Sequence, residues 1–287
     1  MKPNLVYFGS PDFSATILES IIKSGLVNVV GTVTTPDKPS GRNLTLTPSP
    51  VAILAGVHDL PVYKPEKLDE PNLLHLKLLK PDIFLVVSYG KIIPKTYIET
   101  PKIGTFNIHF SLLPKYRGAL CISEAIKNQD KTTGVTLMEM DELLDHGPII
   151  FQVEVPIDIN DDTAALTTKL TQASITLLAD KLPEICAHNY SITAQDETKI
   201  VFTPSHKTLN RQAAYIPYEK LLDGPEIHAL IRSLNPSPGA WTNINGTDIK
   251  ILKTSLVENK LILDIVQLPG KSPISWKQFR AGHTNVK

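Results

Sequence analysis

Phe106-Asn107-Ile108-His109-Phe110-Ser111-Leu112-Leu113-Pro114-Lys115-Tyr116-Arg117-Gly118 is the stretch that decides the fold of this chain. Three apolar side chains alternate with Asn107 and His109, which is the period of a β-strand that turns one face to a core. Pro114 and Gly118 then break the pattern and predict a loop. Asn107 and His109 are therefore expected at the carboxyl end of a strand, the edge at which open α/β sheets place their ligands.

A second polar turn follows a second strand-like run. Residues 134–140 predict a strand, and residues 141–148 follow it with Asp145 in a turn. Because both groups follow strands, we expect Asn107, His109 and Asp145 to converge on one pocket. The alternative is that the asparagine and the histidine are solvated side chains on an edge strand, with a structural role only.

The composition is typical of a globular protein of two domains. The chain has 287 residues, of which 42% are hydrophobic and 20% charged. Its longest apolar run, residues 83–87, is too short to span a membrane, and no signal-peptide pattern follows Met1. We therefore expect a cytoplasmic protein without a membrane partner. Cys121 and Cys186 form no Cys-x-x-Cys motif and predict reduced thiols, not a disulfide or a zinc site.

The net charge of zero hides an asymmetry along the chain. Residues 1–205 carry 18 Lys and Arg against 23 Asp and Glu, a balance of −5, whereas residues 206–287 carry 11 against 6, a balance of +5. A basic carboxyl-terminal region favours a polyanionic partner. An even spread of these charges over a solvated surface is the alternative.

Residues 1–205 alternate between strand and helix signals. Residues 5–8 predict a buried strand, followed by a helix with Ser10 as N-cap, Pro11 at its first position and Gly25 as its stop. Further strands are expected over residues 27–34, 60–63, 82–88 and 149–157, and further helices over residues 51–56, 73–79, 120–128 and, interrupted near Pro183, 164–187. This alternation indicates a Rossmann-like domain with a mostly parallel sheet. The first strand lacks a Gly-x-Gly-x-x-Gly turn, so a nicotinamide cofactor is rejected.

Residues 35–50 form a proline-rich connection without periodicity, which predicts a functional or disordered loop. Arg42 lies within it and could contact a phosphate, although a solvated arginine is the alternative.

Residues 206–287 predict a second, smaller domain, with a helix over 225–234 and strands over 240–245, 248–254 and 260–267. The Asn-Gly pair between the first two strands indicates a hairpin, and the spacing indicates a partial β-barrel.

Several motifs together resemble the methionyl-tRNA formyltransferases, and the resemblance runs along the whole chain. The motifs are FGSPDF at 8–13, PDKPSGR at 36–42, NIH at 107–109, SLLPKYRG at 111–118, DHG at 145–147 and NPSPG at 235–239. The NIH and SLLP motifs are shared by formyltetrahydrofolate-dependent transferases in general, so they indicate the chemistry. The PDKPSGR loop and the carboxyl-terminal region resemble the tRNA enzymes in particular.

The resemblance implies transfer of a formyl group from the co-substrate 10-formyltetrahydrofolate to the α-amino group of initiator methionyl-tRNA, for translation initiation. It implies a catalytic domain over residues 1–205 and a shortened OB-like, tRNA-binding domain over residues 206–287. We expect this enzyme to act as a monomer and without a metal.

The resemblance also implies roles for individual residues. Asn107 would donate a hydrogen bond to the oxyanion, His109 would donate a second one or exchange protons, and Asp145 would orient His109 and accept the amine proton. The folate would contact Tyr89 and Gly90 at one strand end, and Ser111, Leu112, Leu113 and Pro114 in the loop. The tRNA would contact Arg42.

The chain departs from the family pattern at four places. Residues 43–47 lack the family's lysines, Phe110 replaces a glycine, Leu120-Cys121 replaces Ala-Pro, and the carboxyl-terminal region is shorter. Two other functions are left open. A sugar-nucleotide N-formyltransferase would use the same three residues without needing a basic carboxyl-terminal region. A catalytically silent folate- or RNA-binding module would not need the His/Asp pair.

Overall fold

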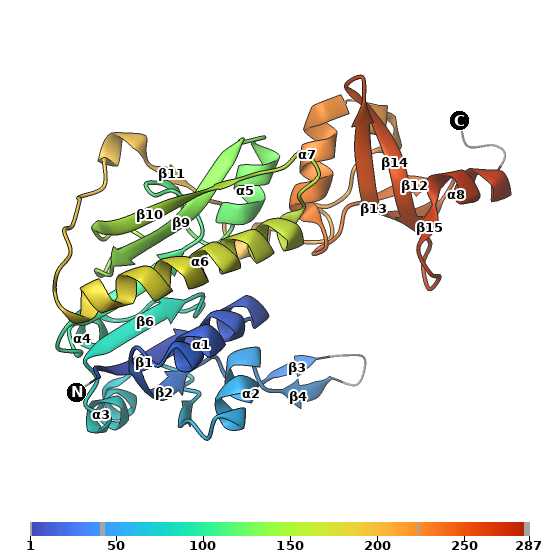
Figure 1. Ribbon diagram of the computed structural model, residues 1–287. Helices are drawn as coiled ribbons and strands as arrows, with labels where there is room; N and C mark the ends of the chain where they lie inside the picture. Colours follow the sequence, from blue (N-terminus) through green and yellow to red (C-terminus); the bar gives the residue numbers. More distant parts are fainter. Residues whose placement is uncertain (1, 41–43, 223, 284–287) are drawn as a thin grey trace. The chain divides into compact units, whose positions relative to one another are not determined.

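A computed structural model describes residues 2–40, 44–222 and 224–283. The chain divides into two compact units, each made from separated segments (Figure 1). Unit 1 comprises Met1–Arg117, Gly134–Val155 and Thr168–Val201, and unit 2 comprises Gly118–Thr133, Pro156–Thr167 and Phe202–Lys287. The predicted mixed α/β fold is confirmed, whereas the domain boundary between residues 205 and 206 stays a prediction.

Unit 1 is built on a seven-stranded sheet. In sheet order its strands are β10 (Ile149–Pro156), β9 (Thr132–Glu139), β7 (Gly104–His109), β6 (Ile83–Val87), β1 (Asn4–Gly9), β2 (Asn28–Val33) and β5 (Val62–Tyr63). The five strands from β7 to β5 run parallel to one another, and β9 is antiparallel to β7. Strand order reverses between β1 and β6, and ligands of open α/β sheets bind beyond the carboxyl ends of strands at such a point.

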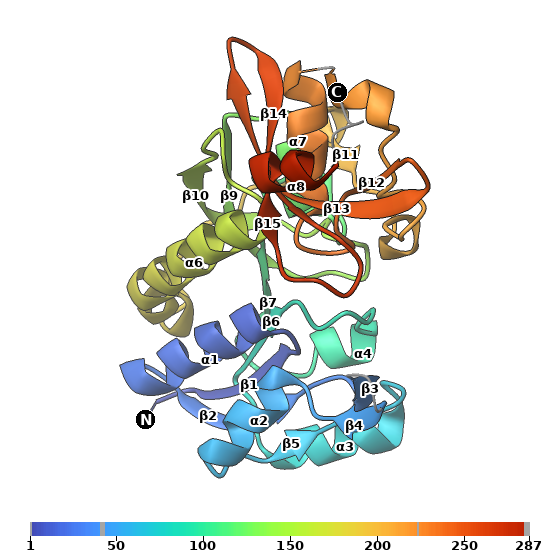
Figure 2. The same ribbon diagram turned by 90° about the vertical axis from the view of Figure 1, so that its right-hand side faces the viewer.

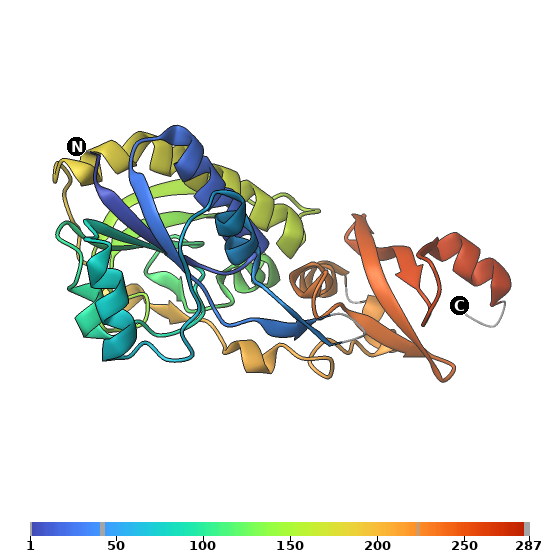
Figure 3. The ribbon, with the colours of Figure 1, turned by 90° about the horizontal axis from the view of Figure 1, so that it is seen from below.

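Helices cover both faces of this sheet. They are α1 (Asp12–Ser24), α2 (Pro50–Val57), α3 (Glu70–Leu78), α4 (Lys95–Ile98) and α6 (Thr163–Cys186). Phe8 of β1 packs with Leu73 of α3, whereas Tyr7 points the other way and donates its hydroxyl proton to the Ser14 carbonyl of α1, at 2.7 Å. Figure 3 shows α1 and α6 on one side of these strands and α3 on the other. β6 and residues 5–8 of β1 are apolar throughout because both of their faces are buried.

Two local predictions in unit 1 are wrong, and the structure adds a hairpin that the sequence did not predict. Helix α1 has Pro11, not Ser10, at its N-cap, and the Ser10 hydroxyl instead contacts the Thr34 and Thr35 hydroxyls, each at 3.2 Å. Helix α6 continues through Pro183, near which Leu182 and Ile185 are buried, so tertiary packing outweighs propensity. The connection over 35–50 contains an antiparallel hairpin of β3 (Lys38–Ser40) and β4 (Thr45–Thr47). The predicted stop of α1 at Gly25, with φ 59°, is confirmed.

Short elements of the structure lie next to the loop over residues 111–118, which follows β7. Strand β8 (Lys115–Arg117) pairs with β11 (Val201–Phe202), and η1 (Glu197–Lys199) is a single 3₁₀ turn. An isolated antiparallel bridge joins Ile149 of β10 to Thr193, so the chain after α6 returns along the sheet edge. This return brings residues 195–197 beside the end of β8.

Unit 2 contains a four-stranded antiparallel sheet, which confirms the predicted small β module. Its order is β12 (Trp241–Ile244), β13 (Thr247–Val257), β14 (Lys260–Gln267) and β15 (Ile274–Ser275). Asn245 and Gly246 join β12 to β13 with φ values of 50° and 81°, as a two-residue hairpin turn requires. Helix α8 (Trp276–Gly282), which the sequence did not predict, lies against this sheet (Figure 2). Its Phe279 side chain is buried in the core of the module.

The remaining elements of unit 2 are α5 (Cys121–Lys127), η2 (His206–Thr208), η3 (Tyr218–Leu222) and α7 (Gly224–Leu234). Helix α7 binds the segment around residue 160 through buried polar groups. His228 Nε2 donates to the Ile159 carbonyl, and its Nδ1 accepts from the Thr254 hydroxyl, both at 2.8 Å. Arg232 Nη1 donates to the Asp161 carbonyl at 2.7 Å. Burial lowers the pKa of His228 and that of Arg232.

Candidate active site

Asn107 and His109 lie on β7, which is a central strand and not an edge strand. Asn107 is paired with Val86 of β6 and with Met138 of β9, and His109 is paired with Thr136 of β9. Only 8% of Asn107 and 7% of His109 is exposed. Both side chains are thus more buried than an alternating strand with one solvated face would leave them.

Asp145 meets both side chains, as the sequence predicts. Asn107 Nδ2 donates to Asp145 Oδ1 at 3.5 Å, and His109 Nδ1 lies 3.7 Å from Asp145 Oδ2. Asp145 comes from the turn between β9 and β10, and 15% of its side chain is exposed. An amide donor, an imidazole and a carboxylate therefore surround one point at the carboxyl end of β7. Their catalytic roles stay predictions.

The hydrogen bonds of His109 define its tautomer. His109 Nε2 lies 2.9 Å from the backbone carbonyl oxygen of Tyr116. Because a carbonyl oxygen only accepts, Nε2 carries a proton and donates it. The nitrogen that remains for proton exchange is Nδ1, which faces Asp145. A second proton on Nδ1 makes the ring an imidazolium with a carboxylate beside it, which is a favourable pair.

The loop after β7 is held by two polar side chains from neighbouring strands. The Thr136 hydroxyl donates to the Ser111 carbonyl at 2.6 Å and accepts from the Leu113 backbone N–H at 3.2 Å. Gln152 Nε2 donates to the Leu113 carbonyl at 3.0 Å. Leu112 packs over Gly134, where a Cβ atom would lie 2.5 Å from a leucine methyl carbon. The predicted folate residues Ser111 to Pro114 thus form a braced loop beside His109, and their ligand stays a prediction.

Tyr89 and Gly90 follow β6 and differ in their surroundings. Gly90 is exposed with φ 82°, a conformation that favours glycine. Tyr89 is buried, and its ring lies edge-on to Phe8 with centroids 5.5 Å apart. The Tyr89 hydroxyl is buried without a hydrogen-bond partner, and burial raises the pKa of Tyr89 to about 12. Of this predicted pair, Gly90 offers the accessible surface.

Three further sequence predictions concern residues around the site. Arg42 lies outside the described residues. Phe110, which stands where the family has glycine, is buried against Phe13 with ring centroids 5.1 Å apart. Cys121 is a buried thiol in α5. Within the described ranges, no group of three or more His, Cys, Asp or Glu side chains is arranged to hold a metal ion.

Sequence reasoning missed the groups that hold Asp145 and His109 in place. The Tyr116 carbonyl accepts a hydrogen bond from His109. The side chain of Arg117 donates a hydrogen bond to the side chain of Gln195. Arg117 stands in the stretch quoted first, but its partner is 78 positions away. Gln195 lies in a turn-rich segment whose pattern carries no signal for a buried amide.

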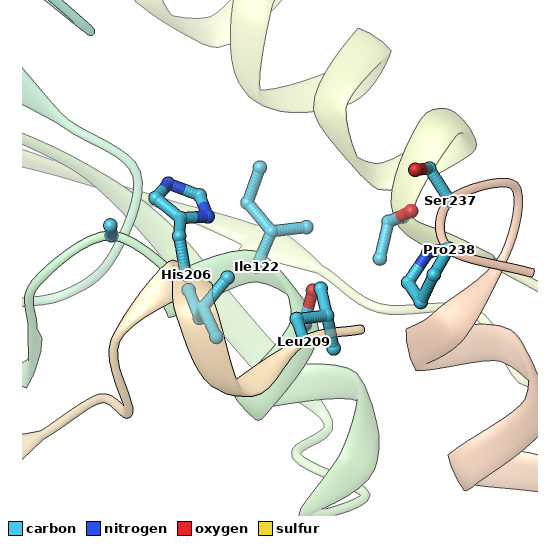
Figure 4. A pocket seen from close by; sticks show the side chains of 9 residues that line it. Ile122, His206, Leu209, Ser237 and Pro238 are labelled. Atoms are coloured by element: carbon cyan, nitrogen blue, oxygen red, sulfur yellow. The ribbon is translucent and has the colours of Figure 1, made fainter. Parts of the chain in front are cut away.

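A separate pocket of about 320 Å³ lies within unit 2 (Figure 4). Side chains from α5, η2 and the turn after α7 line it, together with Thr163 at the start of α6; they include Ile122, His206, Leu209, Ser237 and Pro238. None of the site residues predicted from the sequence lines this pocket.

Comparison with known proteins identifies the family. Residues 2–182 match the formyl transferase family, and residues 223–262 match the formyl transferase C-terminal domain. The methionyl-tRNA formyltransferase of Bacillus velezensis is 40% identical over 257 residues, which cover 89% of this chain and 79% of that protein. The chain belongs to the formyltransferase family.

Solved formyltransferases share this fold at low identity. A sugar 3N-formyl transferase, crystallised with dTDP and 5-N-formyl-THF, superposes with a TM-score of 0.68 at 22% identity over 95% of this chain and all of the other. The methionyl-tRNA formyltransferase from Clostridium thermocellum superposes with a TM-score of 0.59 at 16% identity, over 93% of this chain and 98% of the other. At such identities the likeness shows the Rossmann-like formyltransferase fold alone. None of the described helices is long and apolar enough to cross a membrane.

Proposed function

We propose that this formyltransferase transfers a formyl group from 10-formyltetrahydrofolate to the α-amino group of initiator methionyl-tRNA. The observation that carries the proposal is the 40% identity to a methionyl-tRNA formyltransferase over 89% of the chain. The convergence of Asn107, His109 and Asp145 supports the chemistry, and the basic balance of residues 206–287 supports an RNA acceptor.

The described residues fit a formyl donor at the carboxyl end of β7. Gly90 leaves an exposed strand end next to β7, and the Ser111–Pro114 loop is held rigid by Thr136 and Gln152. A rigid loop and an exposed strand end are suited to bind a flat ring system with polar edges. When bound, the donor supplies the formyl group and takes back one proton as its carbon–nitrogen bond breaks.

Asn107 is suited to stabilise charge on the formyl oxygen. Its amide carries two N–H groups, one of which faces Asp145 Oδ1 at 3.5 Å. The site is largely buried, so a hydrogen bond to developing negative charge is stronger there than in water. One oxyanion donor of this kind typically lowers a barrier by about 3 to 4 kcal/mol.

His109 and Asp145 are suited to take the proton that the attacking amine must lose. The Nε2 proton of His109 is held by the Tyr116 carbonyl, so exchange takes place at Nδ1. Asp145, 3.7 Å from Nδ1, stabilises the positive charge that the ring then carries. Imidazole is the side-chain group that most often exchanges protons in catalysis, which suits this role.

Residues 206–287 are suited to contact the RNA acceptor. Lys250 and Lys253 of β13 and Lys260 at the start of β14 are all exposed. Lysines on one small sheet can neutralise phosphates without reading bases. The contact of Arg42 with tRNA stays a prediction, as do the cytoplasmic location and the monomeric state.

An acceptor assay tests the proposal. The purified chain is incubated with 10-formyltetrahydrofolate and either methionyl initiator tRNA, methionyl elongator tRNA or an amino-sugar nucleotide, and products are identified by mass spectrometry. We expect formylmethionine released from initiator tRNA after mild base treatment. Product from the sugar alone would replace the acceptor that we propose. Folate or RNA binding without product in any arm would favour a silent binding module.

A further inference from the structure

The turn that carries Asp145 requires support from elsewhere in the chain. Asp145 has φ 47°, in the left-handed region that non-glycine residues rarely adopt. The turn lies between the ends of β9 and β10. A carboxylate on such a turn keeps its position opposite His109 only if other groups hold its backbone.

Gln195 provides this support from the segment after α6. Its Nε2 donates to the Asp145 carbonyl at 2.9 Å and to the Gly147 carbonyl at 2.8 Å. The two N–H groups of one amide are thus used on two carbonyls of the same turn. Only 9% of Gln195 is exposed, so these bonds are shielded from water. The Ile149–Thr193 bridge fixes the backbone just before Gln195.

Arg117 fixes the orientation of the Gln195 amide. Its Nε and Nη2 donate to Gln195 Oε1 at 3.0 and 2.8 Å. A guanidinium only donates and a backbone carbonyl only accepts, so the amide cannot be turned over without losing every one of these bonds. Arg117 is 2% exposed, and its Nη2 also donates to Glu197 Oε1 at 2.8 Å.

The same network reaches His109. Arg117 directly follows Tyr116, whose carbonyl accepts the proton of His109 Nε2. A closed ring of contacts therefore runs from His109 through Tyr116, Arg117 and Gln195 to Asp145, and from the Asp145 carboxylate back to His109 Nδ1. One side chain, Gln195, joins the half that holds the imidazole to the half that holds the carboxylate.

Other charged groups lie beside this ring of contacts, at the turn over residues 141–147. His146 Nδ1 lies 2.5 Å from Asp141 Oδ2, and its Nε2 lies 3.6 Å from Glu197 Oε1. Glu197 therefore contacts both Arg117 and His146. These pairs surround the turn, whereas Gln195 holds the backbone of Asp145 itself.

We propose that Gln195, oriented by Arg117, is a positioning residue that keeps the Asp145 carboxylate opposite His109 Nδ1. The inference rests on the proposed catalytic roles of His109 and Asp145. It assigns a role to Gln195, which acts through Asp145 and contacts neither substrate. Displacing a reacting group by about 1 Å can lower a rate about 100-fold, so a buried amide at this distance from the chemistry can control turnover.

Gln195→Glu is the informative variant. A glutamate keeps the length of the side chain and an oxygen for Arg117, but it places a second oxygen against the two carbonyls instead of a donor. We expect kcat to fall about 10- to 100-fold, with KM for both substrates changed by less than about threefold. Thr198→Ala, which alters an exposed polar residue of the same segment, is the matched control and keeps the parent kcat.

A second measurement reads the site without turnover. Histidine side chains labelled with ¹⁵N are observed by NMR at one fixed pH, with His109 assigned by its loss in His109→Asn and separated in this way from His146. If Gln195→Glu displaces Asp145, the surroundings of His109 Nδ1 change and the ¹⁵N resonances of its ring move. Melting curves of each variant show whether the fold is retained.

The outcomes separate the positioning role from the catalytic roles. A Gln195→Glu enzyme with a low kcat, an intact melting transition and moved His109 ¹⁵N resonances supports the proposal. Resonances that stay in place overturn it, and so does a kcat within about threefold of the parent if Asp145→Asn is slow. If Asp145→Asn and Gln195→Glu both have a normal kcat while Gln195→Glu moves the His109 resonances, the catalytic roles fail and the positioning role stands. Should Gln195→Glu not fold, Arg117→Lys, which keeps the charge but loses the fork that orients the amide, is judged by the same two readouts.

Discussion

His109 Nδ1 lies 3.7 Å from Asp145 Oδ2, although one residue belongs to the central strand β7 and the other to a turn beyond β9. The opposite ring nitrogen, Nε2, is bound to the Tyr116 carbonyl at 2.9 Å. The imidazole therefore has a partner at each nitrogen: the backbone contact fixes the tautomer, and the Asp145 carboxylate faces Nδ1. This arrangement leads to the following expected outcomes.

Asp145→Asn should lower kcat at least tenfold with little loss of stability. The amide has the same shape as the carboxylate but no negative charge to stabilise a protonated His109. The measurement is the steady-state rate of formyl transfer to methionyl initiator tRNA, with melting curves alongside. Glu142→Gln, a neutralisation of an exposed residue of the same loop, is the control and should keep the parent rate. A normal rate for Asp145→Asn would remove the carboxylate from the mechanism.

Asn107→Ala should lower kcat about 100- to 1,000-fold, the usual cost of losing one oxyanion donor. Because the donor acts on charge that develops during the reaction, KM should change much less than kcat. Rates with saturating substrates measure this effect. Asn28→Ala, an exposed asparagine at the amino-terminal end of β2, is a matched control. Loss of substrate binding with an unchanged kcat would contradict the proposed role of Asn107.

Gly147→Ala should lower kcat by displacing the Asp145 turn. A Cβ atom at Gly147 would lie 2.0 Å from the Glu139 carbonyl oxygen, so the backbone of the turn must shift. Gly56→Ala is the control because nothing lies within 4 Å of its added Cβ, and alanine is the better helix residue in α2. Rates and melting temperatures of both variants provide the comparison. A Gly147→Ala enzyme as active as Gly56→Ala would mean that the turn tolerates the shift.

Stability should fall as the pH falls below about 6.5, with His228 as one cause. Burial lowers the pKa of His228 in the folded chain, so the unfolded chain takes up the proton first as the pH drops. The contribution of His228 to the free energy of unfolding is thus complete above its pKa in the unfolded chain. It is lost as the pH falls toward its lower pKa in the folded chain. Melting temperatures at pH 7.5 and 5.5 test this expectation. The difference between the two should be smaller in His228→Asn but unchanged in His75→Asn, which alters an exposed histidine of α3.

Binding of methionyl-tRNA should weaken steeply with salt if unit 2 contacts phosphates. Replacing Lys250, Lys253 and Lys260 by alanine should reduce the slope of log K against log salt by about one for each lysine that contacts a phosphate. Filter binding across a range of potassium chloride concentrations measures the slope. Lys80→Ala, an exposed lysine of unit 1 that follows α3, is the control. A slope that the triple variant leaves unchanged would place the phosphate contacts elsewhere.

The local pattern determined much of the fold. Buried strands such as β1 and β6 stand out as apolar runs, and Gly25 and Asn245-Gly246 stop or turn the chain at positions where positive φ is needed. These signals act over a few residues, so sequence alone reveals them. The break predicted at Pro183 shows the limit of this approach, because the packing of α6 carries the helix through that residue.

The sequence also predicted which polar residues meet at the carboxyl end of β7. The alternation around Asn107 and His109, and the turn at Asp145, place polar groups after strands, and the order of parallel strands brings those ends together. Only the tertiary structure decided how these groups are held. Arg117 and Gln195 meet because the chain after α6 returns along β10 to the end of β8. Such a contact depends on long-range packing, and no local periodicity records it.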